Sequence, residues 1–318
     1  MHLTGKFFRD SRLFCGGRSF IVALLLLGST SFAAAEDGKH LFRYKFKPGE
    51  TLRAKVVHQA QVRTTIEGSS QTASTVSKST KVWFVSEVDG SGKVTFVHSV
   101  DHVDMKNEVT GREAIKYDSR SDDKPPSGFE HVAKRIGVPL TRIKMTDRGE
   151  ILEREELAPD DASEPTQMVL PLPEKAIAVG ETWSHPNEFT LTLESGATKR
   201  IKTRQRFELK NVEHGVATIH VATQVLTPVD SAEVRAQLVQ RESEGTIRFD
   251  LDAGRLMSQT IDLDRHVVGH PNPKSSMHYR TRFTEELLEA NDETTPVVSK
   301  SKDKEDVATK ESTEKTTK

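Results

Sequence analysis

Cysteine is almost missing from this chain of 318 residues, which has only Cys15. That residue lies in an N-terminal leader that we expect to be removed, so the remaining chain has no cysteine. Its absence excludes disulfides, a cysteine nucleophile and thiolate metal sites. The fold must therefore be held together by burial of side chains, and residues 36–290 suffice for one large or two small cores.

Other features are also scarce. The chain has two Trp and three Tyr, which is few for a sugar-stacking surface. It has no Gly-x-Ser-x-Gly elbow, His-Glu-x-x-His motif or phosphate loop, although a triad scattered among its many Ser, His and Asp residues stays open. Removing a leader with four basic residues and one acid from totals of 46 and 47 leaves a net charge of −4. This balance gives no general attraction to nucleic acid.

What is present at the start of the chain is an export signal. Basic residues precede the apolar run Phe20–Leu27, and the small residues Ala33, Ala34 and Ala35 follow it. This order is typical of a signal peptide, and we expect cleavage after Ala35. The apolar run has eight residues, whereas a membrane-spanning helix needs about 20. We therefore expect an exported protein, periplasmic or extracellular, with no membrane span after cleavage. The basic residues are Lys6, Arg9, Arg12 and Arg18.

Changes in composition divide the chain. Residues 291–318 have no aromatic residue and mix charges with Thr and Ser, so they cannot bury enough apolar area to offset the entropy of ordering. Residues 159–173 are punctuated by prolines, which deny a β-ladder its N–H donors. We expect a signal peptide, a first β-rich unit, a Pro-rich joint, a second β-rich unit and a disordered charged tail. The bounds are 1–35, 36–158, 159–173, 174–290 and 291–318.

Alternation of apolar and polar residues dominates the body of the chain. Ile247, Phe249 and Leu251 alternate with polar residues, and the turn sequence Asp252–Arg255 follows. A second alternating run comes next, so this region predicts a β-hairpin with one dry face. The dry face of the second strand is predicted to hold Met257, Gln259, Ile261 and Leu263. Residues 215–225 alternate in the same way, with Ala217, Ile219, Val221 and Val225 on one face.

The two halves of the chain have similar segments in the same order. The sequence KPGETL at 47–52 matches AVGETW at 178–183. Residues 83–97 match residues 207–220, and residues 143–152 match residues 247–257. We therefore predict a mostly antiparallel α+β fold in which two related β-meander units, each with one helix, pack into one body.

Each half has a helix candidate between its matched strands. Phe129, Val132, Ala133 and Ile136 have helical spacing, and Gly137 is placed as a stop. In the second half, Ser231 can cap a helix that runs to about Arg241 and aligns Val234 with Leu238.

The motifs resemble those of a group of uncharacterised secreted bacterial β-proteins. They are Tyr44-x-Phe46-x-x-Gly49-Glu50, the mid-chain Leu172-Pro173 with Val179–Trp183, and the late hairpin G-T-I-R-F-D…G-R-L. The resemblance covers residues 41–288. It implies a secreted β-rich protein, and it carries over no activity and no catalytic residue.

Several motif residues have a structural interpretation. Gly49-Glu50 and Gly180-Glu181 each precede a Thr, as expected for a turn that leads into a strand. Gly254 belongs to a turn. The large Trp183 is predicted to anchor the sheet against a helix, with sugar stacking as the alternative. Trp83 is also predicted to have a structural role. None of these residues is predicted to be catalytic.

Histidine clusters give only weak metal candidates. His98, His102 and Asp104 lie on a predicted strand, where the two histidines would be about 13 Å apart, too far to share an ion. His266 and His270 lie in a predicted loop that can curl, but no third ligand is close in sequence. We therefore expect no metal and no cofactor.

A row of basic residues, Arg200, Lys202, Arg204 and Arg206, shares one face of a predicted strand. It is a candidate binding surface for an anionic glycan, head group or polymer. The alternative is pairing across the sheet with Asp250, Asp252, Asp262 and Asp264.

Export, repetition and the lack of catalytic motifs favour a non-enzymatic envelope or extracellular protein. Its most concrete form is a carrier that holds an apolar or lipidic ligand between sheet and helix. One alternative is a hydrolase of envelope polymers, which predicts clustered His and acidic residues, for instance near residues 266–270. Another is a surface scaffold tethered by its tail. The expected partners are a lipid or an anionic envelope polymer, and no nucleic acid.

Overall fold

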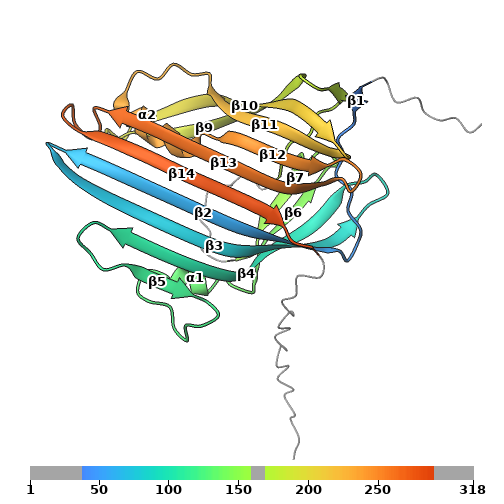
Figure 1. Ribbon diagram of the computed structural model, residues 1–318, viewed down its shortest axis with the longest axis horizontal. Helices are drawn as coiled ribbons and strands as arrows, with labels where there is room; N and C mark the ends of the chain where they lie inside the picture. The colour runs from blue at the N-terminus through green and yellow to red at the C-terminus, as the bar shows by residue number, and fades with distance from the viewer. Residues whose placement is uncertain (1–37, 159–168, 290–318) are drawn as a thin grey trace, which may run out of the picture. The chain divides into compact units, whose positions relative to one another are not determined.

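The computed structural model describes residues 38–158 and 169–289. The predicted leader and tail lie outside these residues. The described part forms a twelve-stranded sheet in the order β7-β6-β4-β3-β2-β14-β13-β12-β11-β10-β9, with β5 beside β4 (Figure 1). Every pairing within this sheet is antiparallel. The prediction of a mostly antiparallel β protein with two α-helices is confirmed.

The neighbouring strands β4, β3, β2, β14 and β13 are each at least 12 residues long. The strands of the first half are β2 (Thr51–Ile66), β3 (Ser69–Val88), β4 (Val94–Val109), β5 (Ile115–Asp118), β6 (Pro139–Met145) and β7 (Ile151–Glu156). Those of the second half are β9 (Thr182–Thr192), β10 (Thr198–Glu213), β11 (Val216–Val225), β12 (Glu244–Asp250), β13 (Arg255–Val268) and β14 (Ser276–Leu287). A separate two-stranded sheet pairs β1 (Lys39–His40) with β8 (Ile177–Ala178).

The two halves of the sheet meet at one pairing. β2 pairs with β14 over twelve residue pairs, from Thr65 opposite Ser276 to Ala54 opposite Leu287. In each half a helix lies between two paired strands: α1 (Glu130–Ala133) between β4 and β6, and α2 (Ala232–Leu238) between β11 and β12. The relation between the halves as repeats stays a prediction.

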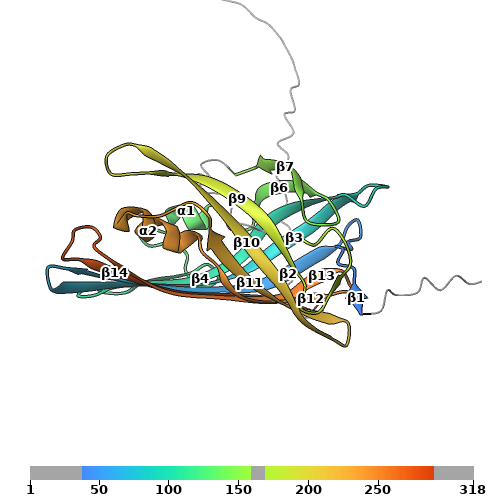
Figure 2. The ribbon, with the colours of Figure 1, turned by 90° about the horizontal axis from the view of Figure 1, so that it is seen from above.

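β-Bulges interrupt the alternation at several places in the sheet, and three of them bear on the cavity and its neighbouring strands. Residues Ser86, Asp101 and Met257 are extra residues without a partner in the register of the neighbouring strand. A bulge bends its strand and increases the local twist. The sheet is strongly curved, and the β9–β11 part crosses in front of the long strands (Figure 2). The bulge at Met257 corrects one prediction, since Leu256 and not Met257 shares the inner face with Gln259 and Ile261.

The helices differ from their predicted lengths. α2 is capped as predicted, because the Ser231 hydroxyl accepts the Val234 N–H at 3.4 Å, and a 3₁₀ turn at Val239–Arg241 continues it. α1 is only four residues long and shorter than the predicted 129–136. It ends early because Ile136 bridges Val100 and the Gly137 N–H donates to the Val100 carbonyl at 2.8 Å. β4 thus draws this segment away from helical geometry.

The largest hydrophobic core joins both halves. Phe96 and Ile143 of the first half pack in the same cluster as Phe207 and Phe249 of the second. Phe42 of the N-terminal segment is fully buried there. The described end of the Pro-rich joint is also part of this core, since Val169, Leu170 and Leu172 are buried in it. This stretch is therefore more than a connection, and its apolar side chains close one end of the folded sheet.

Candidate functional site

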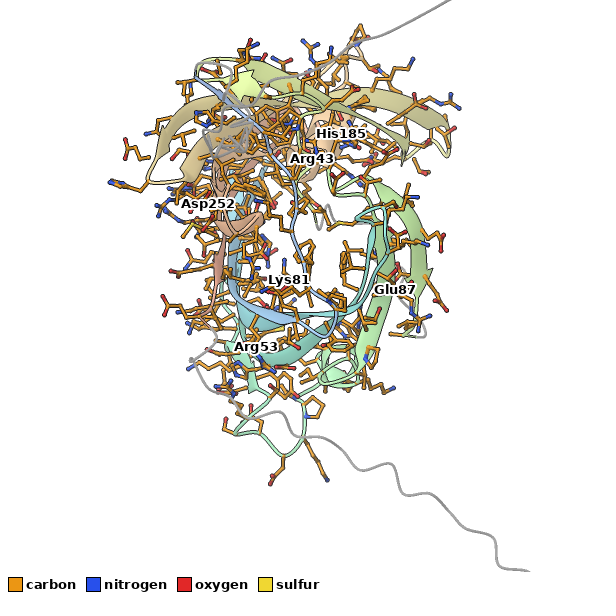
Figure 3. All side chains as sticks on the ribbon, turned by 90° about the vertical axis from the view of Figure 1, so that its right-hand side faces the viewer. Arg43, Arg53, Lys81, Glu87, His185 and Asp252 are labelled. Atoms are coloured by element: carbon orange, nitrogen blue, oxygen red, sulfur yellow. The ribbon has the colours of Figure 1, made fainter. Side chains whose placement is uncertain are left out.

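The concave face of the sheet lines a partly open cavity of about 940 Å³. Strands from β7 across the sheet to β10 line it, together with α1 and the turn after α2. Figure 3 views the curved sheet end on, with the labelled Lys81 on the inner side. The cavity lies between the main core and the helices, so the curvature of the sheet creates it.

Apolar side chains make up much of the cavity wall. Inward positions on alternate residues of β2 and β14 supply Leu52, Val56, Phe283 and Leu287, as the two-residue period of a strand requires. Other strands and α1 add further apolar groups. These are Trp83, Val100, Val103, Val132, Ile136, Leu140, Phe207, Val221, Ile247, Leu256 and Ile261.

One ion pair lies in this apolar wall. The Lys81 ammonium contacts one carboxylate oxygen of Glu285, and the Gln259 amide donates to the other oxygen at 2.7 Å. The side chains of Lys81 and Glu285 are 15% and 6% exposed. Lys81 also lies over the Trp83 ring, 5.0 Å from its centroid. Two opposite charges are thus held together away from bulk water.

A second polar contact lies nearby on the same wall. His58 Nε2 is 2.9 Å from the Thr281 hydroxyl. Burial lowers the pKa of His58 below its ordinary value. The imidazole is therefore neutral at neutral pH, and this part of the wall carries no charge.

The N-terminal segment and the end of the joint close the cavity toward the core. Tyr44 and Leu170 both line it. The Tyr44 hydroxyl donates to the Leu170 carbonyl and accepts the Leu170 N–H, both at 3.1 Å. Burial raises the pKa of Tyr44 well above its ordinary range. The phenol is therefore neutral, and its ring stacks on Phe46 at 5.6 Å between centroids.

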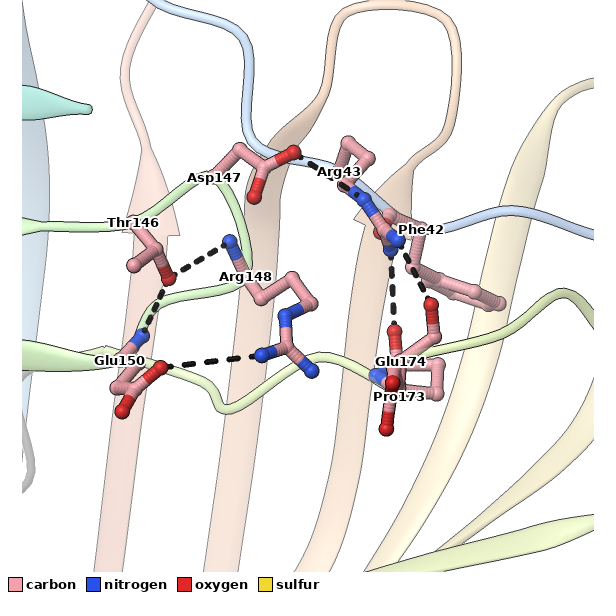
Figure 4. Close-up of polar contacts among 8 residues, drawn as sticks. All are labelled: Phe42, Arg43, Thr146, Asp147, Arg148, Glu150, Pro173 and Glu174. Carbon is pink, nitrogen blue, oxygen red and sulfur yellow. Dashed lines mark hydrogen bonds and ion pairs between the residues drawn. The ribbon is translucent and has the colours of Figure 1, made fainter. Parts of the chain in front are cut away.

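Arg43 fastens this closure (Figure 4). Its guanidinium donates to the carbonyls of Phe42, Pro173 and Glu174 at 2.6, 3.1 and 2.7 Å, and its Nε is 3.2 Å from Asp147. One side chain thus ties the N-terminal segment to the joint and to the turn between β6 and β7. The turn itself is braced by Thr146, whose hydroxyl accepts the Glu150 N–H at 3.2 Å.

The Gly-Glu motifs form matching turns. The Gly49 N–H donates to the Val85 carbonyl and the Gly180 N–H to the Leu209 carbonyl, both at 2.8 Å. Both glycines have positive φ, +79° and +90°. Glu50 and Glu181 each accept a backbone N–H three residues earlier, at 3.1 and 2.7 Å. These contacts agree with the predicted turns that lead into strands.

Other structural residues lie near these turns. Gly254 has φ +62°, and a Cβ there would lie 2.7 Å from the Arg43 carbonyl oxygen. Trp183 stacks on Phe207 at 5.1 Å, and its indole N–H donates to the Pro171 carbonyl at 2.8 Å. The prediction that Trp183 packs against a helix is wrong, because the joint and Phe42 cover it instead.

The basic row lies on β10, one strand from the sheet edge, and does not line the cavity. Its predicted pairing with aspartates is wrong, because β10 has only β9 and β11 as neighbours. Arg200 is 3.2 Å from Glu188, Arg204 donates to Gln224 at 2.7 Å, and Arg206 is 3.6 Å from Glu208. Lys202 is exposed. The aspartates lie elsewhere: Asp262 pairs with Arg282 and Asp264 with Arg280, while Asp250 and Asp252 stand at the β12–β13 turn.

The histidine candidates do not converge. The bulge at Asp101 reverses the alternation of β4, so His98 lines the cavity while His102 pairs with Asp118 at 3.2 Å. His266 lies in β13 opposite His278, not in a loop as predicted, and His270 follows the end of that strand. Among residues 38–158 and 169–289, no group of three or more His, Cys, Asp or Glu side chains could hold a metal ion.

Sequence reasoning missed Lys81 and Glu285, and it placed Gln259 on the inner face without giving it a role. The available signal was a charge within an inward row: Lys81 stands between Ser79 and Trp83, and Glu285 between Phe283 and Leu287. These rows belong to strands far apart in sequence, so their meeting required the β2–β14 pairing.

No helix in the described residues is long and apolar enough to cross a membrane. No protein-family model and no curated protein matches the chain.

Solved structures give distant similarities. A structure described as lipid–protein interactions in lipovitellin matches 77% of this chain but only 26% of its own, at 12% identity and a TM-score of 0.42. A DUF1329 family protein from Desulfovibrio piger matches 74% of this chain and 83% of its own, at 10% identity and a TM-score of 0.14. The Pseudomonas aeruginosa MucA/MucB complex matches 73% and 89%, at 8% identity and a TM-score of 0.10. At such scores these similarities assign no function.

Proposed function

We propose that this protein is an exported, non-catalytic carrier that holds an apolar or lipidic ligand inside its curved sheet. The observation that supports this proposal is the cavity of about 940 Å³ with its largely apolar wall. Ligand pockets commonly measure about 300–1,000 Å³ and combine apolar walls with a few placed polar groups. Apolar cavities bind apolar molecules readily because water finds few hydrogen-bond partners in them.

The rival hydrolase hypothesis predicted a polar cleft with clustered His and acidic residues, for instance near residues 266–270. The cavity lies elsewhere, and neither His266 nor His270 lines it. The carrier is therefore the better supported of the two. The scaffold hypothesis depends on residues 291–318, which lie outside the described residues.

Export is supported by the leader with its cleavage signal at Ala33–Ala35. We propose that the protein functions in the periplasm or outside the cell. N-terminal sequencing of protein recovered from the envelope and culture fractions tests this. A chain that begins at Glu36 is expected, and a chain that keeps its leader in the cytoplasm would contradict it.

The two tryptophans of the chain make the carrier proposal testable, because Trp83 lines the cavity and Trp183 does not. A bromine-labelled stearoyl methyl ester quenches indole fluorescence on contact. In the Trp183→Phe variant we expect saturable quenching of Trp83. The matched Trp83→Phe variant keeps only Trp183 and should show little quenching. Equal quenching of both tryptophans, or of neither, would contradict ligand binding in the cavity.

A further inference from the structure

The ion pair inside the cavity needs a physical reason. Removing two opposite charges from water costs free energy that their attraction often fails to recover, and apolar replacements of similar volume frequently serve a protein as well or better. Lys81 and Glu285 nevertheless stand among Trp83, Phe283 and Leu287 in the wall. If the cavity had only to bind apolar molecules, an apolar wall would do so without the cost of burying two charges.

The pair is built across four adjacent strands. Lys81 of β3 lies opposite Ala54 of β2, and Ala54 in turn lies opposite Leu287 of β14. The small Ala54 lets Lys81 reach across β2 to Glu285. Gln259 of β13 lies directly opposite Glu285 and donates to it at 2.7 Å. The result is a polar line across the floor of the cavity.

This polar line has hydrogen-bonding capacity left over. Both oxygens of Glu285 are occupied, by Lys81 and Gln259. The Lys81 ammonium has three N–H donors, and its identified contacts are Glu285 and the face of Trp83. The Trp83 indole N–H is buried and has no hydrogen-bond partner among the described residues. The same is true of the Gln205 amide oxygen, also on the cavity wall.

The charge of this part of the wall is balanced. Glu285 neutralises Lys81, so an anion bound at Lys81 would also face a carboxylate. Several other charged side chains of the wall are held in opposite-charge pairs as well. They are Arg53 with Asp101, Arg154 with Glu156, Arg255 with Glu50, and Glu242 with Arg265. Around Lys81 the wall therefore offers hydrogen-bond donors beside a positive charge that Glu285 compensates.

We infer that the cavity selects an uncharged amphiphile, an apolar chain with an ester, amide or hydroxyl oxygen that accepts hydrogen bonds from Lys81 and Trp83. This inference rests on the carrier function proposed above and names its ligand class. A hydrocarbon would leave the donors without a partner, which costs binding free energy. A carboxylate would be repelled by Glu285 and would lose its hydration.

The test compares three bromine-labelled probes with the same chain: a stearoyl methyl ester, ionised stearate at mildly alkaline pH, and octadecane. Quenching of Trp83 is measured in the Trp183→Phe background. We expect the ester to bind about tenfold more tightly than either other probe, as one or two hydrogen bonds to a charged donor allow. Tighter binding of stearate than of the ester would overturn the inference.

Substitution at Glu285 should reverse this order. Glu285→Gln keeps the side-chain shape and leaves Lys81 with an uncompensated charge. The variant should therefore bind stearate more tightly than the ester. The double variant Lys81→Met, Glu285→Gln removes both charges. The affinities for the three probes should then become similar. Asp262→Asn is the matched control, because Asp262 pairs with Arg282 and both are more than half exposed. It should leave the order unchanged.

The outcomes separate the two proposals. If none of the three probes quenches Trp83, the carrier function itself fails. If all three quench equally in the unaltered cavity, a carrier remains but the selectivity inference fails. If Glu285→Gln does not fold, the double variant, which leaves no unpaired charge, still decides whether the ion pair sets the order of the probes.

Discussion

The apolar inner face of the curved sheet is covered differently at its two ends. At the end near the β12–β13 turn, Phe42, Phe249 and Ile143 fill the interior with no exposed surface. Toward the helices, the inner face carries Phe283 and Tyr279, but these line a cavity. Close packing needs side chains from both sides. The N-terminal segment and the joint supply the second side at one end only, so the same kind of strand forms a core there and the wall of a cavity elsewhere.

A pair of phenylalanines tests this contrast most strongly. Phe249 is fully buried and contacts the rings of Phe42 and Tyr44, whereas Phe283 faces the cavity. Phe249→Ala should lower the free energy of unfolding by about 3–5 kcal/mol, the usual cost for a buried ring. Phe283→Ala should cost about 1 kcal/mol, because fewer packed neighbours are lost. Urea unfolding measures both, and equal losses would show that the two ends are packed alike.

A pair of glycines tests how closely the N-terminal segment is held. Both Gly254 and Gly92 have positive φ, but a Cβ at Gly254 would collide with Arg43 and Lys45, whereas one at Gly92 meets nothing within 4 Å. Gly92→Ala should cost about 1–2 kcal/mol from backbone strain alone. Gly254→Ala should cost clearly more. Thermal unfolding of the two variants is the measurement, and similar losses would mean that the segment moves aside freely.

Arg43 tests the fastening of the closed end. Arg43→Lys keeps the charge but cannot reach three carbonyls and Asp147 together, so a loss of about 1–2 kcal/mol is expected. Arg142→Lys is the control, because its pairing with Glu155 is exposed and should be worth less than about 1 kcal/mol. Chemical unfolding that affects both variants equally would refute the role of Arg43.

The smallest expected effect concerns pH and the cavity wall. The pKa of His58 is lowered in the folded protein by burial, so the unfolded chain binds its proton more readily. The stability that neutral His58 contributes is present above its unfolded pKa and is lost as the pH falls through and below that value. His58→Gln should flatten the loss of stability between about pH 7 and pH 5. An unchanged pH profile, followed by unfolding at several pH values, would contradict this.

The alternation of apolar and polar residues predicted many strands of the sheet. Ile247 and Phe249 alternate with polar residues, and both are buried as expected. Ser231 caps its helix because the capping signal lies within four residues. The extra residues Asp101 and Met257 had no comparable signal, since a bulge depends on the register of the partner strand. For this reason the face of Met257 was assigned wrongly.

The candidate site was harder to predict than the fold. The sequence analysis expected an apolar cavity between sheet and helix, but it did not predict the polar line within that cavity. Lys81 and Glu285 meet only because β2 lies between β3 and β14. No local pattern in either strand indicates which distant strand will become its neighbour. The Ser231 cap depends on residues close together in sequence, whereas the contact between Lys81 and Glu285 depends on the order of the strands in the sheet.

That β2–β14 junction also has a consequence for the order of folding. Strands β2 to β7 and strands β9 to β14 are each contiguous, and within the large sheet only this pairing connects them. Pairings between distant segments form slowly, because a long loop must be closed before they contribute. The cavity floor therefore cannot exist until residues 276–287 have joined β2. Because residues 276–287 form the last strand of this sheet in sequence, the cavity floor is completed only after all its other strands have been synthesised.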